Sequence, residues 1–114
     1  MNIGIDLDAT ITAYPAFFSS FSKAMHAQGH TIYIITDRPD DAEPEIKQIL
    51  VQCGITYDHI EITDDKASFI IDHHVEVLFD DMDRYFVDLP ESVAVFKVRQ
   101  HYNFDFDDHK WLGT

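Results

Sequence analysis

Hydrophobic residues along this chain alternate between two patterns, continuous apolar runs and apolar positions at helical spacing. The runs at residues 2–7 and 31–36 are nearly unbroken and rich in β-branched residues, which is typical of buried strands. Shorter apolar runs occur at 59–63, 75–79 and 93–98. The pattern therefore predicts five strands.

Segments with helical spacing lie between these runs. Pro15 occupies a favoured first-turn position, and apolar residues recur at helical intervals until Gly29. Two further helices are predicted. We expect Asp40 or Asp41 to cap the first, which Gly54 ends, and Asp64 or Asp65 to cap the second, which runs to about His74. A short helical stretch is expected before the last strand.

Strands that alternate with helices indicate an α/β protein with a doubly wound, mainly parallel, five-stranded sheet of Rossmann-like type. The 114 residues are enough for one such domain, and we expect residues 1–114 to form it. The tail over about 100–114 is acidic and aromatic, and its pattern predicts no element.

Composition narrows the class of protein. With 46% hydrophobic and 25% charged residues, the chain has the make-up of a soluble globular protein. The net charge of −13 argues against nucleic acid or an anionic membrane as an unaided partner. Cys53 is the sole cysteine, so no disulfide forms within the chain. Without a long apolar stretch or a signal-peptide pattern, a cytoplasmic protein is expected.

Polar residues follow three of the predicted strands at the point where each ends. Asp6 and Asp8 follow the first strand, Thr36 ends the second, and Asp80 and Asp81 follow the fourth. Ligands of open α/β sheets bind beyond the carboxyl ends of the strands, so these side chains are expected to converge. Carboxylates that close together repel unless a cation offsets them, and carboxylate oxygens suit Mg²⁺.

Two cationic residues extend this picture. Lys66 opens the third predicted helix, where the helix dipole disfavours a positive charge, so a site at the strand ends would explain its position. Arg38 lies in the loop after the second strand and is a candidate contact for a substrate phosphate, with an ordinary surface arginine as the alternative. Taken singly, the aspartates could be turn caps, Thr36 a strand residue and Lys66 a surface lysine. Their joint placement favours a phosphate and Mg²⁺ site.

The same residues resemble the motifs of the haloacid dehalogenase (HAD) superfamily of phosphohydrolases. The segment Asp6-Leu7-Asp8-Ala9-Thr10 is similar to its first motif, Asp-x-Asp-x-Thr/Val. The other three motifs follow in the family's order, as Thr36, Lys66 and the pair Asp80-Asp81, so the resemblance spans residues 2 to about 98.

The resemblance implies a role for each residue. Asp6 would be the nucleophile that forms an aspartyl-phosphate, and Asp8 the general acid and base. Thr36 and Lys66 would bind the phosphoryl oxygens. Mg²⁺ would be held by four aspartates: Asp6, Asp8 through its backbone carbonyl, Asp80, and Asp81.

Two features bear on the substrate. The segments between the motifs are filled by predicted helices and a short strand, which leaves no room for the cap domain of many relatives. Capless relatives act on large substrates or take a lid from another subunit. The resemblance therefore leaves three possibilities: a phosphoprotein substrate, a nucleotide substrate, and a homo-oligomer in which another subunit supplies the lid. Gln100-His101-Tyr102-Asn103 is similar to a Gln-Pro-Tyr-Asn segment of the deoxyribonucleotidase-like branch, although the proline is missing here.

The sequence thus predicts a Mg²⁺-dependent phosphomonoester hydrolase. A phosphotransferase variant of the same chemistry is open. The main alternative is a catalytically silent module that binds phosphate and Mg²⁺, although every catalytic position of the family is filled here. A receiver-type phospho-acceptor domain also combines these residue types, but it carries the acidic pair on its first strand and the lysine last.

Overall fold

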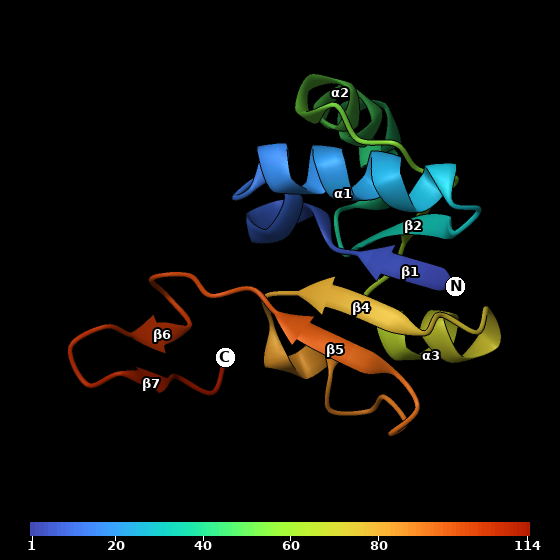
Figure 1. Cartoon of the computed structure of the whole chain (residues 1–114). Coiled ribbons are helices and arrows are strands. Elements are labelled where there is room, and N and C mark those ends of the chain that lie inside the picture. Colours follow the sequence, from blue (N-terminus) through green and yellow to red (C-terminus); the bar gives the residue numbers. More distant parts are fainter.

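The computed structural model describes all residues, 1–114, and its centre is one five-stranded sheet (Figure 1). The strand order is β3-β2-β1-β4-β5, and each neighbouring pair is parallel. The predicted α/β class with a doubly wound sheet is confirmed, and the sheet is parallel throughout. The strands are β1 (Asn2–Ile5), β2 (Thr31–Thr36), β3 (His59–Ile62), β4 (Val77–Asp80) and β5 (Ala94–Lys97).

Three α-helices cover the two faces of the sheet. Helices α1 (Pro15–Ala27) and α2 (Glu43–Cys53) lie on one face, and α3 (Lys66–Asp72) lies on the other (Figure 1). Shorter helical turns connect these elements at Leu7–Ile11, Asp40–Ala42 and Asp83–Tyr85. No helix of the structure combines the length and the apolar character needed to cross a bilayer.

The helix ends follow from local chemistry, with one correction. Gly54 closes α2 in the left-handed conformation (φ +69°), and the Asp65 side chain caps α3 by accepting the Ser68 N–H at 3.2 Å. The prediction that Asp40 or Asp41 caps the second helix is wrong. Both belong to the preceding turn, and α2 starts at Glu43 without a side-chain cap.

Each face of the sheet has its own hydrophobic core. Ile34 packs with Phe18 and Leu50 beneath α1 and α2, whereas its neighbour Ile35 packs with Phe69 against α3. Side chains alternate along a strand, so a strand that is covered on both faces must be apolar at successive positions. This explains the unbroken apolar run in the sequence.

The path of the chain places β1 beside β4. From β1 the chain proceeds outward through β2 and β3, and then returns to the opposite side of β1 as β4. The Asp6 N–H donates to the Phe79 carbonyl at 2.9 Å, which holds the two strand ends together. The strand order reverses here, and open α/β sheets bind their ligands at such a point.

The tail, for which the sequence predicted no element, contains a small hairpin beyond the sheet (Figure 1). Strand β6 (Phe104–Asp105) pairs in antiparallel fashion with β7 (Lys110–Trp111). In the connecting turn, the N–H groups of Asp107 and Asp108 both donate to the Asp105 carboxylate at 3.0 Å.

Candidate functional site

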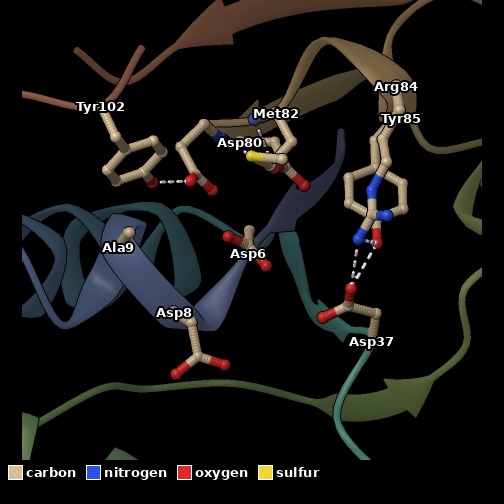
Figure 2. A pocket seen from close by; sticks show the side chains of 10 residues that line it. Asp6, Asp8, Ala9, Asp37, Asp80, Met82, Arg84, Tyr85 and Tyr102 are labelled. Carbon is tan, nitrogen blue, oxygen red and sulfur yellow. Dashed lines mark hydrogen bonds and ion pairs between the residues drawn. The ribbon is translucent and has the colours of Figure 1, made fainter. Parts of the chain in front are cut away.

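A cavity of about 330 Å³ opens at the carboxyl ends of β1 and β4 (Figure 2). Its lining comes from loops after β1, β2 and β4 and from the segment after β5. Half of its ten lining residues are acidic: Asp6, Asp8, Asp37, Asp80 and Asp81.

The floor of this cavity is a buried group in which one ammonium lies between two carboxylates. Lys66 Nζ is 2.9 Å from Asp6 Oδ1 and 2.7 Å from Asp80 Oδ2. Lys66 is only 1% exposed, and its Nζ also lies 4.1 Å from the centre of the Tyr85 ring. Because Lys66 begins α3, its side chain reaches the strand ends from the face opposite α1. The structure thus gives a reason for a cation at this helix start.

A third buried carboxylate, that of Asp81, completes the floor. Oxygen atoms of Asp6, Asp80 and Asp81 all lie within 4.8 Å of one another. These are hard oxygen donors, and one ammonium faces three carboxylates, so the donor set fits a divalent cation such as Mg²⁺. We call Asp6, Lys66, Asp80 and Asp81 the acidic corner.

The pKa shifts in the acidic corner reflect a balance between burial and the opposite charges of Lys66 and the carboxylates. Burial raises the pKa of Asp6 well above its usual range, and the charge of Lys66 offsets this only in part. Burial likewise raises the pKa of Asp80 against the opposing effect of Lys66. For Lys66, burial alone would lower the pKa, but Asp6 and Asp80 outweigh it and raise it. With one ammonium and three carboxylates, the corner can accommodate the positive charge of a bound cation.

Asp8 lies at the rim of the cavity and not in the acidic corner. Its carboxylate accepts two hydrogen bonds from Arg38, Nε to Oδ2 at 2.9 Å and Nη2 to Oδ1 at 2.8 Å. Arg38 also contacts Glu45 at 3.1 Å through its Nη1 atom. Ala9, which follows, is left-handed (φ +60°), and Figure 2 shows the Asp8 side chain directed away from Asp6. We call Asp8, Arg38 and Glu45 the rim triplet.

Thr36 is fully buried at the end of β2 and does not line the cavity. Its hydroxyl oxygen accepts the Arg38 N–H at 3.4 Å. Of the residues that the sequence singled out, the structure therefore brings four together, places Asp8 and Arg38 at the rim, and leaves Thr36 beneath the rim.

One wall of the cavity was not foreseen from the sequence. The Asp37 carboxylate accepts hydrogen bonds from the Tyr85 hydroxyl at 2.5 Å and from Arg84 at 2.8 Å. Burial alone would raise the pKa of Asp37, but the Tyr85 hydroxyl, followed by the charges of Lys66 and Arg84, lowers it. Burial, together with Asp37, raises the pKa of Tyr85. The sequence signal for this wall was slight, namely that Asp37 directly follows a strand end.

The opposite wall comes from the segment after β5. The Tyr102 hydroxyl donates to the Asp81 carboxylate, and the Asn103 side chain donates to the Asp81 carbonyl at 3.0 Å. The Gln100 side chain donates to the Ala9 carbonyl at 2.7 Å. The sequence pointed to this segment only through the similarity of residues 100–103 to a known motif.

Comparison with known proteins gives a fold but no family. No protein-family model and no curated protein matches the sequence. A chain of a solved structure described as "Structure of Pnkp1/Rnl/Hen1 complex" is similar, with a TM-score of 0.65 and 18% sequence identity. The match covers 85% of this chain and 44% of that chain, so this chain spans less than half the length of its neighbour. At this identity the likeness establishes a shared fold, and membership of the HAD superfamily stays a prediction.

Proposed function

We propose that the chain is a Mg²⁺-dependent phosphomonoester hydrolase in which Asp6 carries the transferred phosphoryl group. The observation that supports this most strongly is the acidic corner, with Lys66 Nζ between Asp6 and Asp80 beneath an open cavity at the switch point of the sheet. Phosphoryl transfer needs a fixed nucleophile and positive charge beside the phosphoryl oxygens. Both requirements match this arrangement.

Asp6 has the properties of a fixed nucleophile. One carboxylate oxygen accepts from Lys66, and the other accepts the Thr10 hydroxyl at 3.1 Å. In the first step an Asp6 oxygen bonds to phosphorus while the ester O–P bond breaks, and its electron pair leaves on the ester oxygen. Asp8 supplies the proton that this oxygen takes up.

The second step removes the phosphoryl group from Asp6 and restores its free carboxylate. Water attacks the phosphorus of the aspartyl-phosphate, and its proton passes to Asp8. The bond between phosphorus and the Asp6 oxygen breaks, and inorganic phosphate leaves with the carboxylate of Asp6 restored. An alcohol in place of water would turn the same chemistry into phosphoryl transfer.

Asp6, Asp80 and Asp81 would hold the metal ion. When bound, Mg²⁺ supplies positive charge against the phosphoryl oxygens. Lys66 supplies positive charge from below, and its two short contacts keep the carboxylates of Asp6 and Asp80 in place.

The proton step requires Asp8 to move. Both of its oxygens accept hydrogen bonds from Arg38, and the carboxylate points away from Asp6, so it cannot reach a leaving group from this position. A phosphate monoester in the cavity would compete with Asp8 for the Arg38 guanidinium. Arg38 would thereby bind substrate and release Asp8 in one movement.

The substrate is expected to provide its own cover. The segments between β1 and β2 and between β2 and α3 are used up by α1, α2 and β3, so no inserted domain lies over the cavity. A phosphorylated protein or a nucleotide would cover the acidic corner itself, or a second copy of the chain would act as a lid. The charge of −13 disfavours long nucleic acids.

The position of Asp8 also favours a second candidate function. A chain whose acid is held away from the nucleophile could bind phosphate and Mg²⁺ without turnover. This silent module differs from the hydrolase in one respect, namely that Asp8 does not leave Arg38 when phosphate binds.

Hydrolysis of p-nitrophenyl phosphate, with Mg²⁺ and with EDTA, tests the proposal. We expect turnover that needs Mg²⁺ and that falls at least about 1,000-fold in Asp6→Asn. Asp41→Asn, which changes an exposed aspartate outside the cavity in the same way, should retain activity. Folded protein that binds Mg²⁺ but never turns over would favour the silent module, and equal activity in Asp6→Asn would exclude Asp6 as nucleophile.

A further inference from the structure

We propose that Gln100, Tyr102 and Asn103 form a positioning clamp that fixes Asp81 for a divalent cation and ties it to the loop after β1. This inference rests on the metal site of the proposed function. It concerns residues after β5, outside the four motifs in which the sequence placed its candidate chemistry.

Asn103 anchors the clamp. It is fully buried, and its side chain makes three hydrogen bonds. Its Nδ2 donates to the Asp81 carbonyl at 3.0 Å and to the Val98 carbonyl at 2.9 Å, while its Oδ1 accepts the Gln100 N–H at 2.7 Å. Two donors and one acceptor on one short side chain require an amide. Asn103 therefore fixes the backbone of Asp81 relative to the end of β5.

Tyr102 acts on the carboxylate of the same residue. Its hydroxyl donates to Asp81 Oδ2, whereas 47% of the tyrosine is exposed and it lines the cavity. A ring that is half exposed contributes little to the core, so the hydroxyl contact is the main feature of this position. It holds Oδ2 of Asp81, a carboxylate that has an oxygen within 4.8 Å of oxygens of Asp6 and Asp80. Such outer contacts orient a metal-binding carboxylate.

Gln100 connects the clamp to the other side of the site. Its Nε2 donates at 2.7 Å to the carbonyl of Ala9, the left-handed residue that follows Asp8. One short segment thus contacts the loop after β4 at both the backbone and the carboxylate, and the loop after β1 at the backbone. The two strand ends that carry the acidic corner share one support.

Titration calorimetry with MgCl₂ on the full chain tests the clamp. Loss of an outer contact of this kind typically lowers metal affinity by roughly 10-fold to 100-fold. We expect Tyr102→Phe to raise the Kd for Mg²⁺ about 10-fold, and to lower the melting temperature in EDTA less than Asn103→Ser does because the ring is kept. Tyr57→Phe is the matched control, since Tyr57 lies before β3, away from the strand ends that carry the site.

A second variant and a second readout sharpen the test. Asn103→Ser should weaken Mg²⁺ binding at least as much as Tyr102→Phe, and it should also lower the melting temperature in EDTA because a buried hydrogen-bonding group is lost. In turnover assays, Tyr102→Phe should raise the half-saturating Mg²⁺ concentration about 10-fold, with kcat recovering at high Mg²⁺. A residue with only a structural role would not produce this recovery.

The outcomes separate the two proposals. Equal Kd values for the natural chain and Tyr102→Phe would overturn the clamp and leave the metal site intact. A natural chain that does not bind Mg²⁺ would overturn both. Mg²⁺ binding that weakens in Tyr102→Phe, without turnover of any phosphate ester, would support the clamp and overturn the hydrolase.

Discussion

The site contains two groups in which one cation lies between two carboxylates. In the acidic corner, Lys66 lies between Asp6 and Asp80, and all three are buried. In the rim triplet, Arg38 lies between Asp8 and Glu45, whose side chains are 49% and 66% exposed. The two groups differ in their contact with water and in the additional buried carboxylate of Asp81.

This difference sets what each group can do. Buried charges are costly to separate, because a partner that is left behind has neither water nor an opposite charge. Exposed ion pairs exchange easily with water and with other ions. The acidic corner therefore suits a fixed frame for a metal ion and a phosphoryl group, whereas the rim triplet suits contacts that break when a substrate arrives.

Removal of the buried ammonium is expected to have the largest effect. Lys66→Met keeps an unbranched side chain but leaves the buried carboxylates of Asp6 and Asp80 without their cation, which should cost roughly 3–5 kcal/mol in the free energy of unfolding. Urea unfolding in EDTA measures it. The matched control is Lys47→Met at an exposed i,i+4 pair with Glu43, which should change stability little. Similar losses in the two variants would remove the distinction between the buried and exposed groups.

Mg²⁺ is expected to act on the acidic corner and not on the rim triplet. At a concentration 100 times its Kd, Mg²⁺ should stabilise the natural chain by about 2.7 kcal/mol. Asp81→Asn should lose most of this gain, while Asp8→Asn should keep it because the Asp8 side chain lies outside the corner. Urea unfolding with and without Mg²⁺ gives both values. Equal losses in the two variants would contradict the distinction between the acidic corner and the rim triplet.

The arginine of the rim triplet should matter for substrate and not for folding. Arg38→Gln should change the free energy of unfolding by less than about 1 kcal/mol, because the pairs that it breaks are at the surface. One lost charge-assisted hydrogen bond to phosphate should raise the KM for p-nitrophenyl phosphate roughly 10-fold. Steady-state kinetics and urea unfolding check the two parts. A stability loss as large as that of Lys66→Met would make the rim triplet structural.

Glu45 should show the smallest effect. Its carboxylate is well exposed and touches Arg38 through one nitrogen, while Asp8 holds the other side of the guanidinium. Glu45→Gln should change stability by a few tenths of a kcal/mol, and KM should stay within about a factor of two. The same two assays apply. A marked gain in activity would show that Glu45 restrains Arg38 against substrate.

The fold could be predicted from the sequence where burial and pairing coincide. The apolar run of β2 gave both of its bounds, because that strand is covered on both faces. The fourth strand was expected at 75–79 but lies at Val77–Asp80. Val75 is buried in the core beneath the sheet but does not belong to the strand. Its hydrophobic character therefore reflects packing in the core and not pairing with a neighbouring strand. The tail hairpin, with two-residue strands, is too short to produce a period.

The candidate site, like the fold, could be predicted from the sequence only in part. The convergence of Asp6, Lys66 and Asp80 follows from strand ends and a helix start, which a pattern reveals. Asp8 lies in a turn in which its own backbone is extended and that of Ala9, a non-glycine residue, is left-handed, and nothing in the sequence signals this. The supporting contacts of Tyr102 come from a segment that joins the site only in three dimensions.

The most direct test of the central claim is to trap the phosphoryl group on the chain. Natural protein would be mixed with a phosphate monoester and Mg²⁺, quenched in acid during turnover, and digested for peptide mass spectrometry. Phosphate is expected on Asp6, and it should be absent from Asp6→Asn and from samples prepared in EDTA. Phosphate on another residue, or steady turnover by Asp6→Asn, would contradict the account.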